Sequence, residues 1–144
     1  MSEKTCQLCS FRNPKATVTA VIARGQEILL AKRTEEPFRG SWDLIGGYMN
    51  EAETPEEALK RELKEELGVE AKLKFMDFFP GYASWKGEDF PVLSLAYLAE
   101  IDFDKVKTNH EIAELKWFHI DDLPKVAFDS NEKIVNYVKT RGII

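Results

Sequence analysis

The residues in this sequence most able to do chemistry are glutamates that crowd one short stretch of the chain. Residues 51–70 contain eight glutamates but only three basic side chains, an excess equal to the formal net charge of -5 carried by all 144 residues. Acidic and basic residues balance over the rest of the chain, so the charge is a local feature. Clustered carboxylates bind divalent cations through oxygen, and Mg²⁺ or Mn²⁺ suits such a ligand set better than Zn²⁺ does.

The local sequence predicts that these glutamates lie on a helix. Thr54 is a suitable N-cap, and Pro55 at the first helical position loses no hydrogen bond. Glu57 stands where its side chain can complete a capping box with Thr54. Gly68 is placed to end the helix after Leu67.

Three carboxylates should share one edge of this helix. At about 100° per residue, Glu62, Glu65 and Glu66 fall within about 100° of one another, beside the face that carries the leucines. Glu62 and Glu66 form a like-charged i,i+4 pair, which is unfavourable on a solvated face. Partial burial would cost more unless a cation neutralised them. The alternative is that these residues are only good helix formers facing solvent.

The remaining sequence predicts one α/β domain. With 44% hydrophobic and 11% aromatic residues the chain can bury a core, which argues against disorder. β-branched and apolar runs predict strands, Gly46-Gly47 is read as a turn, and a second helix is expected near the C-terminus. The predicted strands are 16–23, 27–32, 41–45, 72–79, 92–101 and 115–118, and the second helix is 130–139.

The acidic helix and its flanks carry a longer pattern, Gly47-x5-Glu53-x7-Arg61-Glu62-Leu63-x-Glu65-Glu66-x-Gly68-Val69. This pattern matches every fixed position of the 23-residue Nudix box, so the sequence resembles the Nudix hydrolases. The resemblance implies an α/β/α sandwich with a mixed sheet and a loop-helix-loop catalytic motif. It places the Nudix domain at residues 14–144, after a short N-terminal segment, residues 1–13.

The resemblance also implies a reaction and a metal site. Nudix enzymes hydrolyse the pyrophosphate of a nucleoside diphosphate linked to another moiety, with Mg²⁺ that Mn²⁺ can replace. Carried over to this sequence, Glu62 and Glu66 would be direct metal ligands. The backbone carbonyl of Gly46 would add a ligand, and Glu65 would either bind metal or take the proton of the attacking water.

Further catalytic residues follow from the same resemblance. Arg61 would orient Glu53 or Glu65 through a charge-assisted hydrogen bond. A loop before the closing strand often carries a general base in this family, and Glu111 stands at that position. Glu114 is the second candidate, and simple solvation of the loop is the alternative for both.

Several residues could bind the substrate. Tyr82, Trp85 and Phe90 could stack on a base or serve as edge and core aromatics. Arg33 and Arg39 could bind phosphate or remain surface charges. ADP-ribose-like nucleotide sugars are the leading substrate class, and nucleoside triphosphate pyrophosphohydrolysis comes second. A Nudix module that senses a nucleotide without hydrolysing it is the main alternative to an enzyme.

The only cysteines, Cys6 and Cys9, form a C-x2-C pair. A closed zinc site needs four ligands, and His110 and His119 lie far downstream. The pair could hold no metal, could share one with the histidines or a second chain, or could be redox active. With Asn13-Pro14 it resembles the second knuckle of the zinc ribbon ahead of the Nudix domain in NADH pyrophosphatases. A zinc-dependent interaction protein built on this pair is a third, less favoured function.

The composition and charge of the sequence limit the kinds of partner that this protein is expected to bind. No apolar run approaches the roughly 18 residues of a membrane span, and the N-terminus does not resemble a signal peptide, so a cytoplasmic protein without a membrane partner is expected. Outside the acidic helix the charges balance, which argues against nucleic acid as a partner. A homodimer remains open, because dimers are frequent among the proteins that the sequence resembles.

Overall fold

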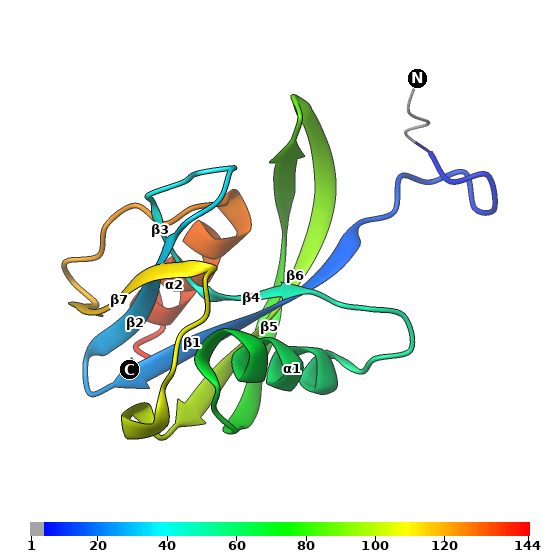
Figure 1. Ribbon diagram of the computed structural model, residues 1–144. Helices are drawn as coiled ribbons and strands as arrows, with labels where there is room; N and C mark the ends of the chain where they lie inside the picture. Colours follow the sequence, from blue (N-terminus) through cyan, green and yellow to red (C-terminus); the bar gives the residue numbers. More distant parts are fainter. Residues whose placement is uncertain (1–4) are drawn as a thin grey trace.

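The computed structural model describes residues 5–144, and that part of the chain folds into seven strands, two α-helices and a short 3-10 helix (Figure 1). In chain order they are β1 (Lys15–Arg24), β2 (Glu27–Arg33), β3 (Trp42–Asp43), β4 (Ile45–Tyr48), α1 (Pro55–Leu67), β5 (Ala71–Trp85), β6 (Glu88–Ile101), η1 (Phe103–Lys105), β7 (Ile112–His119) and α2 (Asp129–Thr140). In this part of the chain no helix is long and apolar enough to cross a membrane.

Strand β1 is the centre of the mixed sheet. It runs parallel to β6 over eight residue pairs and antiparallel to β4, and its last two residues pair with β2. Strand β2 in turn pairs with β3 and β7, while β5 pairs with β6 and forms an edge of the sheet. Because β1 touches three neighbours, it brings the acidic helix region and the β5–β6 hairpin into one structure.

The two helices cover opposite faces of the sheet, as the alternation of side chains along β1 requires. Val18, Ala20 and Ile22 pack with one helix, whereas Val21 packs with the other. The buried leucines of α1 that join the first core are Leu59, Leu63 and Leu67. The buried residues of α2 that join the second core are Ile134, Val135 and Val138. The structure therefore confirms the predicted α/β/α sandwich with a mixed sheet.

Two sequence predictions were wrong in detail. Gly46-Gly47 is not a turn but the middle of β4, paired with Thr19 and Val18 of β1. Strand β5 does not end at residue 79 but continues to Trp85, because Pro80 lies in an edge strand, where its missing N–H does no harm. The chain then reverses at Lys86-Gly87, both with positive φ, so β5 and β6 form a long hairpin that projects beyond the helices (Figure 1).

Candidate active site

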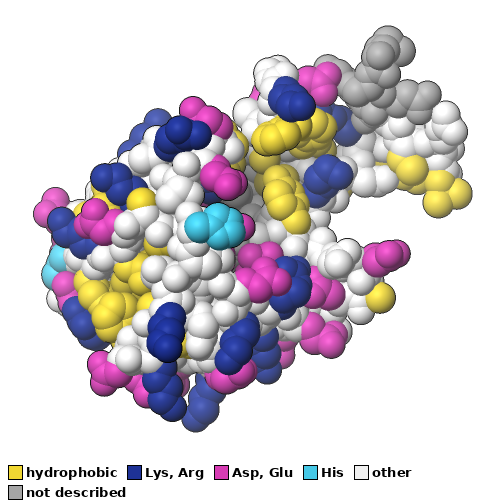
Figure 2. Space-filling model, in the orientation of Figure 1, with side chains coloured by type: hydrophobic (Ala, Val, Ile, Leu, Met, Phe, Trp, Pro, Cys, Tyr) yellow, Lys and Arg dark blue, Asp and Glu magenta, His cyan; other side chains and the backbone are white. Residues whose placement is uncertain are grey.

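A cleft of about 770 Å³ opens between the β5–β6 hairpin, the carboxylate edge of α1 and the loop after β2. Its volume falls within the range of about 300–1,000 Å³ typical of small-molecule sites. Figure 2 shows acidic side chains gathered where the molecule is hollowed beside the projecting hairpin. The cleft is lined by Glu62, Glu65 and Glu66 from α1, by both glycines of β4, and by Glu111.

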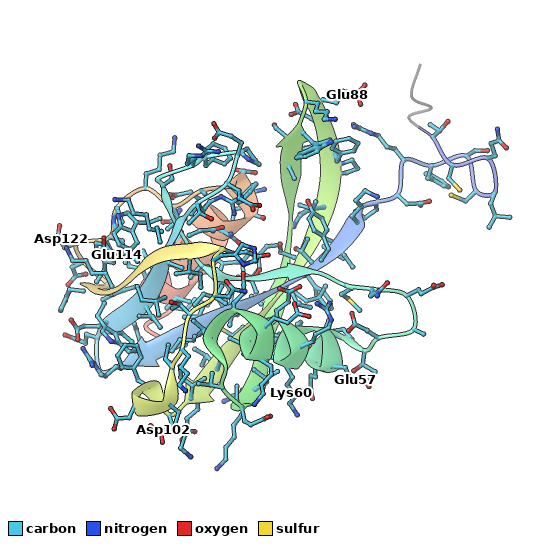
Figure 3. The ribbon with its side chains drawn as sticks, in the orientation of Figure 1. Glu57, Lys60, Glu88, Asp102, Glu114 and Asp122 are labelled. Carbon is cyan, nitrogen blue, oxygen red and sulfur yellow. The ribbon has the colours of Figure 1, made fainter. Side chains whose placement is uncertain are left out.

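The position of the glutamates depends on where α1 begins and ends. Thr54 accepts a hydrogen bond from the backbone N–H of Glu57 at 3.2 Å, and the Glu57 carboxylate accepts one from the backbone N–H of Thr54 at 3.0 Å. Gly68 ends the helix in the left-handed conformation, with φ of 69°. Glu57 and Lys60 point outward from the helix (Figure 3), so the opposite side carries the buried leucines and the site.

Arg61 joins the loop before α1 to the helix. Its guanidinium donates to both carboxylate oxygens of Glu53 at 2.7 and 2.9 Å and to the backbone carbonyl of Tyr48 at 3.1 Å. It also donates to Glu62 at 2.9 Å and lies 3.6 Å from Glu65. The hydrogen bonds from Arg61 lower the pKa of Glu53 to about 2. Arg61 is thus a structural clamp that holds Glu53 ionised.

Among the side chains that line the cleft, Glu66 has the largest shift in pKa. Burial raises its pKa to about 9, and the nearby charges of Glu62 and Glu111 add to the effect. One of its carboxylate oxygens, Oε2, is buried and has no hydrogen-bond partner among the described residues. Burial also raises the pKa of Glu62, although Arg61 opposes that shift. A buried acceptor without a donor destabilises the folded protein. A cation bound beside Oε2 of Glu66 would remove this cost.

The two glycines of β4 leave room for this cluster. A Cβ atom on Gly47 would lie 2.5 Å from the carboxylate of Glu62, and one on Gly46 would lie 2.0 Å from the backbone oxygen of Val18. Gly47 therefore allows the metal-ligand candidate Glu62 to approach the strand. Gly46 allows β4 to lie close against β1.

The donor set fits a divalent cation that prefers oxygen. Glu62, Glu65, Glu66 and Glu111 all line the cleft and repel one another. Within the part of the chain that the structure describes, no three acidic, histidine or cysteine side chains already stand close enough to hold an ion. A cation bound here would have to bring these oxygens closer together.

The loop before β7 brings Glu111 to the cleft through Asn109. The side chain of Asn109 donates to the Glu65 carbonyl at 3.0 Å, and its oxygen accepts the Glu111 backbone N–H at 2.9 Å. The Asn109 backbone N–H also donates to the Glu66 carbonyl at 3.3 Å. Asn109 thus caps the end of α1 and fixes the loop, a role that sequence reasoning missed. Glu114 is exposed on β7, outside the cleft (Figure 3).

The predicted substrate residues divide into two groups. Tyr82, Trp85 and Phe90 line the cleft from the hairpin, and Tyr82 and Trp85 are more than half exposed there. Arg33 lines it too, but its side chain is engaged with the Pro37 carbonyl at 2.8 Å and with Asp43 at 3.4 Å. Arg39 lies outside the residues that line the cleft.

Polar residues on the floor of the cleft were also missed from the sequence. Asp43 is buried, and its carboxylate accepts hydrogen bonds from Asn131 at 2.6 Å and from the backbone N–H of Leu44 at 2.8 Å. Burial still raises its pKa to about 7. Beside it, Ser94 bonds Thr17 at 2.5 Å. The one sequence signal was a charged residue, Asp43, inside an otherwise apolar run; Asn131 and Ser94 gave none.

Substitution of the two glycines should separate stability from activity. We expect Gly47→Ala to keep the fold but to displace the Glu62 carboxylate, lowering kcat/KM by about a hundredfold, the cost of misplacing a catalytic group by about 1 Å. Gly46→Ala should instead lower the thermal midpoint, because its clash is with backbone. Melting curves and kinetics of both variants test this, and full activity in Gly47→Ala would contradict it.

The metal-free protein should lose stability as pH rises. The pKa of Glu66 is raised from 4.5 to about 9, so between these values the unfolded chain binds fewer protons than the folded protein and the free energy of unfolding falls. Asp43, raised from 3.8 to about 7, acts in the same direction. Thermal midpoints in a chelator should decrease from about pH 5 to about pH 9, and Glu66→Gln should flatten the decrease. An unchanged slope in that variant would refute the assignment.

Comparison with known proteins agrees with this geometry. A family model described as the NUDIX domain matches residues 13–138. The chain is 33% identical over 134 residues to the ADP-ribose pyrophosphatase of Methanocaldococcus jannaschii, covering 92% of this chain and 78% of that protein. It is 30% identical over 135 residues to the NAD-capped RNA hydrolase NudC of Stutzerimonas stutzeri, of which it spans only 46%.

Solved structures give the same result. The MutT NUDIX hydrolase from Burkholderia pseudomallei superposes with a TM-score of 0.76 at 28% identity, over 88% of this chain and 98% of that one. The match of the family model spans most of the chain, and the relatives are hydrolases by name. This chain belongs to the Nudix hydrolase family.

Proposed function

We propose that this protein hydrolyses the pyrophosphate bond of a nucleoside diphosphate linked to another moiety, with ADP-ribose-like nucleotide sugars as the first substrate class. The observation that carries the proposal is the buried, unpartnered Oε2 of Glu66 beside Glu62 in an open cleft. The relative named ADP-ribose pyrophosphatase supports the substrate class, because the chain spans 78% of that protein.

The metal-binding residues in this proposal are Glu62, Glu66 and Glu65, with the carbonyl of Gly46. Bound Mg²⁺ would neutralise the pyrophosphate oxygens and lower the pKa of the attacking water. Glu66 must lose its proton to serve as a ligand. The hydrogen bonds of Arg61 keep Glu53 and Glu62 in place while this occurs, and so Arg61 acts by positioning rather than by touching the substrate.

Glu111 is our choice for the general base. It lines the cleft, its charge acts on both Glu62 and Glu66, and Asn109 fixes its backbone. Glu114 lies outside the cleft and is not retained for this role. Glu65 remains the other acceptor for the proton of water, since it is half exposed at the same edge of α1.

The rest of the substrate would lie along the hairpin. Tyr82 and Trp85 present exposed rings to the cleft, where a base could stack. Arg33 is held by Asp43 and Pro37, so its contribution to phosphate binding would be secondary. A nucleotide-sensing module without hydrolysis is disfavoured, because all the carboxylates of the motif are present and line the cleft or support it.

A second candidate class has one observation in its favour. Several relatives that match the chain at 30 to 36% identity are named NAD-capped RNA hydrolase NudC. A dinucleotide pyrophosphate such as NADH therefore belongs in any substrate panel, together with nucleoside triphosphates. The chain spans less than half of these relatives, so their activity transfers to it less directly than that of the archaeal relative.

Incubation with Mg²⁺ and ADP-ribose should release AMP and ribose 5-phosphate. We expect Glu66→Gln to lower kcat by about a thousandfold, because it removes a metal ligand. Glu70→Gln is the matched control, since Glu70 lies four residues on, is exposed and, among the described residues, pairs with Lys64 at 3.4 Å. Product release by chromatography measures both. Retained turnover in Glu66→Gln would refute the metal assignment, and no hydrolysis of any pyrophosphate substrate would refute the function.

The hairpin aromatics should affect KM more than kcat. We expect Tyr82→Ala and Trp85→Ala each to raise KM by about fivefold, because each removes a stacking contact of about 1 kcal/mol. Phe78→Ala is the control, since Phe78 is a comparably exposed aromatic on β5 that does not line the cleft. Equal effects of all three substitutions would show that the hairpin does not contact the base.

A further inference from the structure

The N-terminal segment, residues 5–13, carries a pair of thiols that the active site does not use. Cys6 and Cys9 are both free, and neither lines the cleft. Figure 1 shows the segment extending from the start of β1, away from the sheet and both helices. Because it contacts the domain through Arg12 at the β5–β6 hairpin but extends beyond the sheet and helices (Figure 1), another molecule can approach the thiols without disturbing the fold.

The segment folds into a closed turn that contains both cysteines. The backbone N–H of Cys6 donates to the Phe11 carbonyl at 2.7 Å, and the N–H of Ser10 donates to the Cys6 carbonyl at 2.8 Å. Ser10 takes a positive φ of 66° to close this turn. We name residues 5–13 the thiol knuckle.

The backbone of the thiol knuckle orients the sulfur of Cys6. Backbone N–H groups of Cys9 and Leu8 donate to this sulfur, and the Cys9 thiol is also within hydrogen-bond reach. Thiolates are the form that binds metal, and N–H donors around the sulfur orient it. Zn²⁺ is the usual ion for such a soft sulfur pair and takes four ligands.

The residues that the structure describes do not complete this site. No group of three histidine, cysteine or acidic side chains that could hold an ion exists among residues 5–144. His119 instead lies against Gln26 at 3.3 Å and near Asp121. Among the described residues the two thiols therefore stand alone, and a second copy of the chain could supply two further ligands.

The thiol knuckle of a second copy could supply two further thiolate ligands and a hydrophobic contact surface. Leu8 and Phe11 flank the thiols and are 95% and 72% exposed, the two highest values among the large hydrophobic side chains described. Hydrophobic side chains are visible at the end of the segment in Figure 2. Two knuckles meeting on a twofold axis would cover these side chains and place four thiolates around one ion.

The charges near the thiols also favour a pair of thiol knuckles around one ion. Four thiolates around Zn²⁺ leave two negative charges, and Arg12 is the one charged residue within residues 5–13. Two copies therefore supply two positive charges. Arg12 also donates to the backbone carbonyl of Asp89, which ties each knuckle to the β5–β6 hairpin of its own domain.

We propose that the thiol knuckles of two copies of this chain bind one Zn²⁺ through Cys6 and Cys9 of each copy, forming a metal-bridged homodimer. The contact is confined to a short segment, so the dimer depends on the ion rather than on buried area. The bridge is independent of the hydrolytic site.

The test uses the full chain, stripped of metal and kept reduced with a phosphine. Titration with Zn²⁺, followed by light scattering and metal analysis, should double the mass at one ion per two chains, and a chelator should reverse it. Co²⁺ in place of Zn²⁺ should give the absorption of a tetrahedral four-thiolate site. Cys6→Ser and Cys9→Ser should each remain monomeric, whereas His119→Ala, the control, should dimerise normally.

Three results would overturn the proposal. They are one Zn²⁺ per chain in a monomer, no retention of Zn²⁺ by the reduced protein, and a dimer that persists in the double variant Cys6→Ser/Cys9→Ser. Because the thiols lie outside the cleft, that double variant should keep its Mg²⁺-dependent activity. Mass and metal content therefore report on the bridge even if the proposed hydrolysis is not found.

Discussion

The structure depends on holding like-charged carboxylates at the edge of a buried helix face. Glu62 and Glu66 are one turn apart on α1, beside leucines that are fully buried. Side chains at this spacing repel, and burial raises the pKa of both. The arrangement is tolerable only because the surroundings hold it: Gly47 makes room, Arg61 supplies positive charge, and Asn109 secures the end of the helix.

The parts of this arrangement that local signals specify could be predicted from the sequence. The capping box at Thr54 and the glycine at 68 act over a single turn, so the start and end of α1, and with them the phase of the glutamates, followed directly. Strand β5 was predicted too short because a proline usually ends a strand. Pro80 is tolerated because β5 lies at the edge of the sheet, and that position is set by the tertiary structure. The Gly46-Gly47 pair was read as a turn for a similar reason, since its strand exists only through pairing with β1.

The rest of the site could not be predicted because it forms between distant segments. Asp43 and Asn131 are 88 residues apart and meet only when α2 packs against the sheet. Asn109 and Glu65 are 44 residues apart and meet where the loop before β7 crosses the end of α1. Small polar residues such as these carry no periodicity or motif of their own. The resemblance pointed to the charged ligand candidates, and only the fold shows what positions them.

The metal-free cluster distributes its charge in two ways, which bears on how it would bind a cation. Arg61 forms ion pairs with Glu53 and Glu62. Glu66 is instead neutralised by a proton below its pKa of about 9. A cation that uses Glu66 as a ligand must displace that proton near neutral pH, so cation affinity should rise with pH until Glu66 is ionised. Arg61 adds no pH dependence of its own, because its guanidinium stays charged and bonded to Glu62 throughout this range. A cation bound by this cluster would therefore be coupled to release of a proton at one glutamate, while the permanent charge of Arg61 would keep the neighbouring carboxylates in place.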